Sequence, residues 1–452
     1  METLEIQFVK IGINGEGIGY HDRKPVFCAG VLPNETALIR ITETQERFER
    51  AELVKITSVS SVRVTPECRY QKECSGCAFM HVSHAAQLSF KKQLLTEAMR
   101  KYAHVNPSLI RDIKTDHNNF HYRNSCKMPV QRIKGRMVSG MYRSGSNQFV
   151  PIDTCMIHQT KLEEVRRQAL DIISTSSMTA FDIKHSDGLR YLYVRGLNDQ
   201  YQIALITGRT KPDAELVQRL AAIEGVKTVA YSVNGNRRSR DIFGRTAEVL
   251  AGDGHIIASV NGIQLQLSCQ SFFQMNDAMA ASLYKMAIDK IDPCNTMVEA
   301  YCGVGAMSIM AAAKAKKIIG IESVPEAIVN AKANAVLNHV EDHVDFICAD
   351  AAEGLSKILK EENVDTLLAD PPRSGMDPQM ISLILNSSIS RIVYISCNPS
   401  TAARNINELQ STFTVRTIIP FDLFPETPHV ESLIVLTRNA SKKKGDSHAI
   451  SE

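Results

Sequence analysis

The stretch EAYCGVGA, residues 299–306, decides the fold, because an apolar strand at 297–301 runs here into a glycine loop and then a helical pattern at 307–313. Glycines at such a strand end let a ligand approach the backbone closely. Ser308 occupies the place of the third glycine of a dinucleotide fingerprint, so the loop alone is weak evidence. Glu322 strengthens it, because this carboxylate ends the next strand, where it can accept both hydroxyls of a ribose.

Beyond this stretch, short apolar strands alternate with helical patterns. The expected strands lie at 297–301, 317–321, 344–347, 366–369, 391–395 and 432–436. Such alternation is typical of a doubly wound parallel sheet, whose ligands bind at the carboxyl ends of the strands. We therefore predict an α/β Rossmann-like domain over residues 261–440, beginning near the Asn261-Gly262 hairpin turn.

Two further motifs follow expected strands at the same edge. ADPPRSG, residues 369–375, places Asp370 before two prolines that hold the loop in one shape. SCNPST, residues 396–401, places Cys397 at a strand end, where it could be a core residue, a metal ligand or a nucleophile. Its place beside the other motifs favours a nucleophile.

A thiolate nucleophile suits pyrimidine chemistry. Carbon 5 of uracil is too weak a nucleophile to take a methyl group until sulfur adds to carbon 6 and makes the ring an enolate. A base must afterwards remove the carbon-5 proton. Glu431, directly before the last apolar strand, is the candidate for that base.

The N-terminal half has a different pattern. Residues 1–59 contain short alternating runs at 6–11, 25–31, 36–41 and 51–59, separated by Gly, Asn and Pro, which predicts a small β-barrel. Residues 60–260 mix short strands with helical patterns at 87–102, 162–174 and 214–223, which predicts a central α+β domain. The Lys-rich end, residues 441–452, is expected to be a disordered tail.

The central domain begins with a cysteine cluster. Cys68, Cys74 and Cys77 are closely spaced, and Cys155 is a possible fourth ligand. Four sulfurs suit either tetrahedral zinc or a cubane iron–sulfur cluster, and spacing does not separate the two.

Taken together, these residues resemble the RNA uracil-C5 methyltransferase family over nearly the whole chain. The resemblance is carried by QSFFQMN (270–276), YCGVG (301–305), DPPR (370–373), SCNP (396–399) and HVE (429–431). It implies that S-adenosylmethionine is contacted by Gln274, Tyr301, Glu322 and Asp370. It also implies that Cys397 is the nucleophile and Glu431 the base. Phe272 is expected near the target base, with a core phenylalanine as the alternative.

The resemblance also implies that the N-terminal barrel is a TRAM domain, an OB-like fold that binds RNA. It further implies that Cys68, Cys74, Cys77 and Cys155 hold a [4Fe–4S] cluster. Basic residues of the central domain could contact phosphates: Arg123, Lys127, Arg132, Lys134, Arg136, Arg143 and Arg190.

The function expected from the resemblance is formation of 5-methyluridine in 23S rRNA, or in a folded rRNA segment. The alternative is the T-loop uridine of tRNA. A non-catalytic RNA-binding factor is disfavoured because Cys397, Glu431 and Asp370 are all present. An amino-group methyltransferase is disfavoured because Arg373 stands where that class usually has an aromatic residue.

Composition adds little. Lys and Arg number 52 against 49 Asp and Glu, and the net charge of +3 neither demands nor excludes a nucleic-acid partner. Because no apolar run reaches the roughly 18 residues of a membrane span, we expect a cytoplasmic protein without a membrane partner. One chain would supply RNA-binding, cluster and catalytic units, so we expect a monomer and infer no obligatory protein partner.

Overall fold

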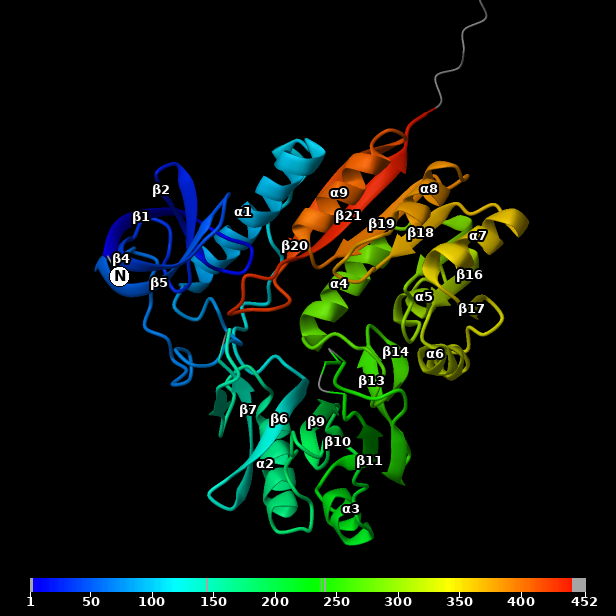
Figure 1. The fold of residues 1–452 in the computed structure, drawn as a ribbon. Coiled ribbons are helices and arrows are strands. Elements are labelled where there is room, and N and C mark those ends of the chain that lie inside the picture. Colours follow the sequence, from blue (N-terminus) through cyan, green and yellow to red (C-terminus); the bar gives the residue numbers. More distant parts are fainter. Residues whose placement is uncertain (1–2, 144, 237, 240, 441–452) are drawn as a thin grey trace, which may run out of the picture.

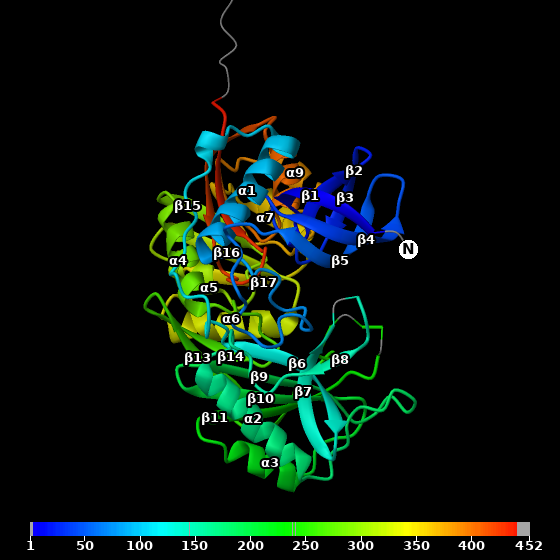
Figure 2. The same ribbon diagram turned by 90° about the vertical axis from the view of Figure 1, so that its left-hand side faces the viewer.

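The computed structural model describes residues 3–143, 145–236, 238–239 and 241–440, and the tail predicted at 441–452 lies outside them. The described chain forms a barrel, a central sheet with two helices and a C-terminal sheet covered by helices (Figure 1). Turned by 90°, the same fold has the barrel and α1 beside the C-terminal sheet and the central sheet below them (Figure 2). In the described residues, no helix is long and apolar enough to cross a bilayer.

The N-terminal barrel is closed, with strand order β1-β2-β3-β5-β4. Its strands are β1 (Thr3–Ile11), β2 (Gly17–His21), β3 (Lys24–Cys28), β4 (Thr36–Thr44) and β5 (Glu49–Ser58). Phe8, Val26 and Ile39 fill its interior without exposure to solvent. The predicted barrel is therefore confirmed, and β2, which was not predicted, completes it.

The central unit is a seven-stranded sheet of order β12-β11-β10-β9-β6-β7-β8. Its elements are β6 (Ser125–Ile133), β7 (Arg136–Tyr142), β8 (Phe149–Pro151), α2 (Thr160–Ser174), β9 (Leu189–Leu197), β10 (Gln200–Thr207), α3 (Ala214–Ala221), β11 (Val226–Val233) and β12 (Glu248–Gly252). Helices α2 and α3 share one apolar core with the sheet. The hairpin of β13 (His255–Val260) and β14 (Ile263–Ser268) contacts β10 on one side and α6 on the other, so it joins this unit to the next.

The C-terminal sheet has the order β17-β16-β15-β18-β19-β21-β20, parallel except for β21. Its strands are β15 (Cys294–Ala300), β16 (Ala315–Glu322), β17 (Val344–Cys348), β18 (Thr366–Ala369), β19 (Arg391–Ser396), β20 (Phe413–Phe421) and β21 (Glu431–Arg438). The predicted parallel sheet is present. Strand β20 was not predicted.

Helices cover both faces of this sheet. They are α4 (Asp277–Asp289), α5 (Ala306–Met310), α6 (Pro325–Leu337), α7 (Ala351–Glu361), α8 (Pro378–Leu385) and α9 (Pro399–Leu409). Neighbouring residues of β16 point to opposite faces of the sheet. Ile318 is buried in the apolar core that α4, α5 and α6 form on one face, and Ile319 in the core that α7, α8 and α9 form on the other. Burial on both faces explains why the strands are continuously apolar.

Helix α1 (His84–Ala103) and the short helix η1 (Pro107–Leu109) follow the cysteine segment in sequence but pack with the C-terminal unit, α1 against α9 and η1 against β20. Leu95 and Met99 of α1 are buried in the same core as α9 and β20. The chain therefore reaches the C-terminal sheet before it builds the central sheet.

Candidate active site

Parallel strand ends bring the predicted site residues to one edge. Ala300 of β15 pairs with Ala369 of β18, so Tyr301 and Asp370 leave neighbouring strands together. Ser396 of β19 pairs with Ser432 of β21, and the Ser432 hydroxyl donates to the Ser396 carbonyl over 3.1 Å. Because β19 and β21 are antiparallel, the residues next to this pair, Cys397 and Glu431, lie opposite each other.

Cys397 faces a cavity of about 220 Å³. Arg373, His429 and Asn398 line it from the C-terminal sheet. Three further lining residues come from far away in sequence: Ile13 and Asn14 from the β1–β2 loop of the barrel and Leu94 from α1. No sequence pattern pointed to Ile13, because its contact with the site depends entirely on how the barrel docks.

The proline loop and the cysteine loop hold each other. The carbonyl of Arg373 accepts from the Asn398 amide over 3.2 Å and from the Thr401 hydroxyl over 3.1 Å. The guanidinium of Arg373 lies 3.4 Å from Nε2 of His429. Burial, followed by the charge of Arg373, lowers the pKa of His429 to about 4, so this imidazole is neutral near pH 7.

The carboxylates and the thiol beside this cavity are electrostatically linked. Burial raises the pKa of Cys397 to about 11, with Glu431 and Asp370 adding to the effect and Arg373 opposing it. Burial, followed by the charge of Asp370, raises the pKa of Glu431 well above its usual value, and the charge of Arg373 opposes this rise. Burial raises the pKa of Asp370 to about 7. Clustered, perturbed groups of this kind mark functional sites.

The glycine loop forms an open shelf at the next strands. Gly303 and Gly305 have φ of +53° and +82°. A Cβ on Gly303 would meet nothing within 4 Å, whereas a Cβ on Gly305 would lie 2.6 Å from the ring of Phe346, so only the backbone at Gly303 is open. Glu322 accepts from the backbone N–H of Gly303 over 3.1 Å. Ser308, in the place of the missing glycine, donates to the buried Glu299, whose pKa burial raises to about 8.

The loop 270–276 borders the same edge. Gln274 is buried, and its carbonyl accepts from the Asn124 amide over 3.0 Å. Asn276 caps α4 and donates to the carbonyl of Leu423 over 3.2 Å. Phe272, in contrast, is 66% exposed, so it is not a core residue. An exposed aromatic ring at this place is available to a ligand.

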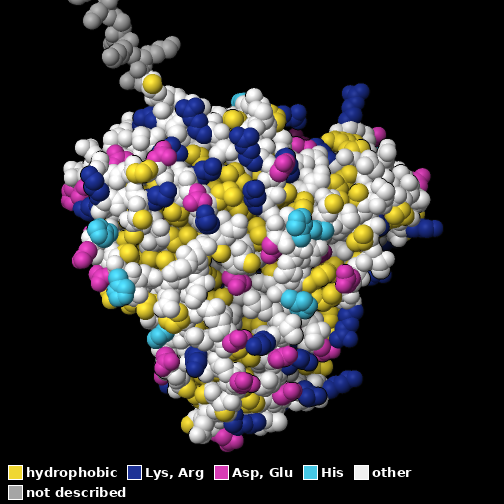
Figure 3. Space-filling view, turned by 180° about the vertical axis from the view of Figure 1, so that it is seen from behind, with side chains coloured by type: hydrophobic (Ala, Val, Ile, Leu, Met, Phe, Trp, Pro, Cys, Tyr) yellow, Lys and Arg dark blue, Asp and Glu magenta, His cyan; other side chains and the backbone are white. Residues whose placement is uncertain are grey.

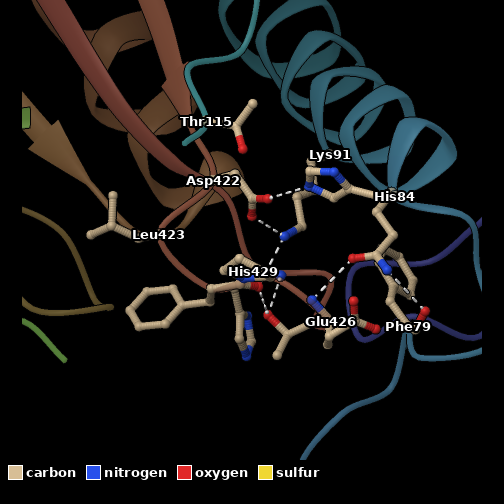
Figure 4. A network of polar contacts seen from close by, with 12 residues as sticks. Phe79, His84, Lys91, Thr115, Asp422, Leu423, Glu426 and His429 are labelled. Atoms are coloured by element: carbon tan, nitrogen blue, oxygen red, sulfur yellow. Dashed lines mark hydrogen bonds and ion pairs between the residues drawn. The ribbon is translucent and has the colours of Figure 1, made fainter. Parts of the chain in front are cut away.

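A buried network holds the loop between β20 and β21 (Figure 4). Lys91 of α1, which is fully buried, pairs with Asp422 and donates to the carbonyl of Phe424 over 2.9 Å. His84 lies 3.4 Å from Asp422. The backbone N–H of Phe79 donates to the carbonyl of Glu426 over 2.9 Å. These bonds fix the loop that leads to His429 and Glu431.

The four predicted ligand cysteines come together. Cys68, Cys74, Cys77 and Cys155 line one cavity, beside Tyr70, Met80, Ile152 and Ile157. Burial, together with the neighbouring thiols, raises the pKa of Cys77. Within the described part of the chain, no three His, Cys, Asp or Glu side chains were found placed to hold a single metal ion.

Helix α2 supports the Cys155 loop with buried charges. The backbone N–H of Cys155 donates to Glu163 over 3.1 Å, and Arg166 donates to the same carboxylate over 2.7 Å and to the carbonyl of Asp153. Burial alone would raise the pKa of Glu163, but hydrogen bonds from His158 and Arg166 lower it to about 2. The loop is thus tied to a rigid helix.

The sequence profile of the family described as tRNA (Uracil-5-)-methyltransferase matches residues 83–439, and that of the TRAM domain matches residues 1–54. The chain belongs to the RNA uracil-C5 methyltransferase family. It is an RNA (uracil-C5)-methyltransferase with an N-terminal TRAM barrel, as its motifs predicted.

Curated relatives match over nearly their full lengths. A Listeria innocua protein described as an uncharacterized RNA methyltransferase is 31% identical, covering 96% of this chain and 98% of the relative. Bacillus cereus and Enterococcus faecalis have proteins with the same description, each 32% identical over 97% of this chain and 97% and 98% of the relatives.

A solved member shares the fold. Pyrococcus abyssi tRNA (uracil-54, C5)-methyltransferase, in complex with S-adenosyl-L-homocysteine, superposes with a TM-score of 0.76 at 22% identity. The match covers 96% of this chain and 99% of that chain. The arrangement of barrel, central unit and C-terminal sheet is therefore that of a known methyltransferase.

Proposed function

We propose that this RNA (uracil-C5)-methyltransferase makes 5-methyluridine by a covalent route, with Cys397 as nucleophile, Glu431 as base and S-adenosylmethionine as methyl donor. The observation that carries the proposal is the pairing of β19 with β21. It sets Glu431 beside the one thiol that faces the cavity formed with the barrel. A nucleophile and a base are needed at adjacent positions for this reaction.

The open loop position at Gly303 suits S-adenosylmethionine. Its open backbone can lie against a nucleoside, and Glu322 at the end of β16 can accept ribose hydroxyls. Tyr301, Gln274 and Asp370 would complete the site. When bound, S-adenosylmethionine supplies a methyl group on a positively charged sulfur. The P. abyssi enzyme was solved with the corresponding product, S-adenosyl-L-homocysteine.

The proposed steps conserve atoms and charge. The thiolate of Cys397 adds to carbon 6 of uracil, and the electron pair moves to carbon 5. Carbon 5 then takes the methyl group, and Glu431 removes the carbon-5 proton. The electron pair left at carbon 5 expels the Cys397 thiolate and restores the ring. A base within folded RNA must first leave its stack to reach Cys397.

Our proposed substrate is a uridine of 23S rRNA, supported by the combination of TRAM barrel and four-cysteine site. A tRNA uridine is the second candidate, supported by the description of the matching family and by the tRNA named for the P. abyssi enzyme. Incubation with labelled methyl donor and each RNA separately, followed by mapping of the modified nucleotide, decides between them.

The covalent step has its own test. We expect Cys397→Ala to lose at least a thousandfold in methyl transfer while S-adenosylmethionine still binds. Cys348→Ala is the matched control, because that thiol is exposed at the end of β17 in the same sheet. Normal turnover by Cys397→Ala would reject the mechanism.

We further propose that Cys68, Cys74, Cys77 and Cys155 hold a structural [4Fe–4S] cluster. Four thiols around one largely apolar cavity form a suitable donor set. Phe79, two residues after Cys77, donates a backbone hydrogen bond to Glu426, so the cluster segment also supports the active-site loop. Protein purified without oxygen should contain iron and sulfide, and Cys74→Ala should lose both. Zinc without iron would contradict the assignment.

A further inference from the structure

A second cavity, of about 450 Å³, lies between the central sheet, the cysteine loop and the loop 270–276. Arg123, Lys127 and Arg195 line it, and no Asp or Glu is among its lining residues. Cys74, Cys77 and Cys155 of the four-cysteine site also line it, so a ligand here would lie next to that site. On the face seen in Figure 3, by contrast, basic and acidic side chains are interspersed. Three cations around one hollow without a carboxylate are therefore a distinct local feature.

The charges of these residues are not neutralised by the protein. Arg195 is 3% exposed and donates to the carbonyls of Ser268 and Ser271, but its Nε has no partner, and neither has Nε of Arg123. None of the three cations forms an ion pair within the described residues. Of the three, only Arg195 is buried, since Arg123 is half-buried and Lys127 is exposed. A buried guanidinium without a counter-charge is costly, and an anion in the cavity would relieve that cost.

The rest of the wall suits a flat, apolar group. Met128, Met141 and Met275 line the cavity, and the exposed ring of Phe272 borders it. The Lys127 ammonium already lies over Tyr193, at 5.5 Å from the ring centroid. Proteins that bind single strands combine cations for the phosphates with aromatic and apolar surfaces for the bases. The lining thus has the chemistry of a nucleotide site.

The cavity and the catalytic edge share a wall. Residues 270–273 and Met275 line the cavity, while Gln274 of the same loop belongs to the predicted donor site. At its far side the cavity shares Lys127, Ile242 and Gln270 with a wider hollow of about 760 Å³. A strand whose target uridine reaches Cys397 could therefore cross Phe272 and continue along the central unit.

We propose that this cavity takes a second, flanking nucleotide of the substrate RNA, turned out of its stack. Its phosphate lies at Arg123, Lys127 and Arg195, and its base packs against Phe272 and the methionines. The proposal rests on the proposed function, in that the ligand is a strand of the methylated RNA. Two splayed nucleotides on either side of the loop 270–276 would fix the register of the target uridine.

The test uses a fluorescein-labelled oligouridylate of 12 nucleotides and the full-length protein. Lys127→Gln removes one cation that has no hydrogen bond to the protein among the described contacts. We expect about fivefold weaker binding and a fall of about 0.7 in the slope of log affinity against log salt. Lys227→Gln, an exposed lysine on β11 outside both hollows, is the matched control and should change affinity less than twofold.

A second measurement locates the bound strand. The same oligomer carrying 4-thiouridine should crosslink, on irradiation, to peptides containing residues 123–128 or 270–275. Crosslinks elsewhere, or an unchanged salt slope in Lys127→Gln, would overturn the proposal even if uridine methylation is found. If free uridine 5′-monophosphate competes as strongly as the oligomer, the site binds free nucleotides and the strand assignment is wrong. If the protein binds the oligomer in a Lys127-dependent way but transfers no methyl group, only the proposed function is rejected.

Discussion

At the scale of single residues, Arg373 sets the electrostatics of the catalytic edge. Burial raises the pKa of Cys397, Glu431 and Asp370 add to the rise, and the guanidinium of Arg373 is the cation that opposes it. It also opposes the rise that burial and Asp370 cause in the pKa of Glu431. The arginine after the two prolines therefore favours the thiolate that the proposed reaction needs.

We expect Arg373→Met to raise the pKa of Cys397 further. Because only the thiolate reacts, and each unit of pKa removes tenfold of it below the pKa, alkylation of Cys397 by iodoacetamide at pH 8 should slow by about tenfold. The rate profile should shift to higher pH, as followed by mass spectrometry of the Cys397 peptide. Arg416→Met, an exposed arginine on β20, is the control. An unshifted profile would contradict this role.

We expect Glu431→Gln to stop the reaction after methyl transfer. The amide cannot remove the carbon-5 proton, so the methylated base should stay bound to Cys397. A band of protein joined to RNA should accumulate on a denaturing gel, and the double variant with Cys397→Ala should not form it. Free 5-methyluridine at the wild-type rate would mean that another group is the base.

These residues differ in how far sequence predicts them. Cys397 and Asp370 stand at strand ends beside Asn398 and Pro371, and Glu322 ends the strand that follows the glycine loop, so local pattern and family resemblance identify them. Arg195 and Ile13 carry no such signal. Arg195 occupies an inward position of β9, and its role depends on which cations converge on it after folding.

At the scale of elements, α1 links the N-terminal part of the chain to the loop between β20 and β21, through the contact of Lys91 with Asp422. Sequence periodicity predicted the helix but not its partner, because a lysine within a helical pattern usually faces solvent. Strand β20 was missed for a related reason. It contains Arg416 and Pro420 and lies at the sheet edge, where proline is tolerated and the apolar pattern is interrupted.

We expect Lys91→Met to lower the free energy of unfolding by about 3–5 kcal/mol, because it leaves the buried Asp422 without its main cation. The double variant Lys91→Met with Asp422→Leu should recover most of this loss. Urea denaturation followed by circular dichroism gives both values. Lys92→Met, whose partner Asp112 is exposed, should change the midpoint little. Equal effects of the two single variants would show that the buried pair is not special.

At the scale of the whole molecule, the barrel is part of the catalytic cavity. Ile13 of the β1–β2 loop lines the same cavity as Cys397, so the unit that is expected to bind RNA would also shape the proposed pocket for the target base. The sequence predicted a barrel, a central unit and a C-terminal sheet along the chain. How they dock could not be read from it, since the contacts that decide docking join residues hundreds of positions apart.

We expect Ile13→Ala to reduce kcat/KM for RNA about tenfold while leaving S-adenosylmethionine affinity unchanged, because the donor shelf is built without the barrel. Val9→Ala is the control, since Val9 is an exposed aliphatic residue of the same barrel outside the cavity. Isothermal titration and initial rates give the two constants. Loss of donor binding in Ile13→Ala would show that the barrel acts through overall stability instead.

The bond between α1 and the last loop also bears on how the protein is made. Lys91 and Asp422 are 331 residues apart. At the usual pace of synthesis, roughly 5–20 residues per second, α1 leaves the ribosome about 15–70 seconds before its partner exists. During that interval its apolar face, with Leu95 and Met99, has no native surface to cover it. Nascent chains of this enzyme should therefore depend on chaperones until translation is nearly complete.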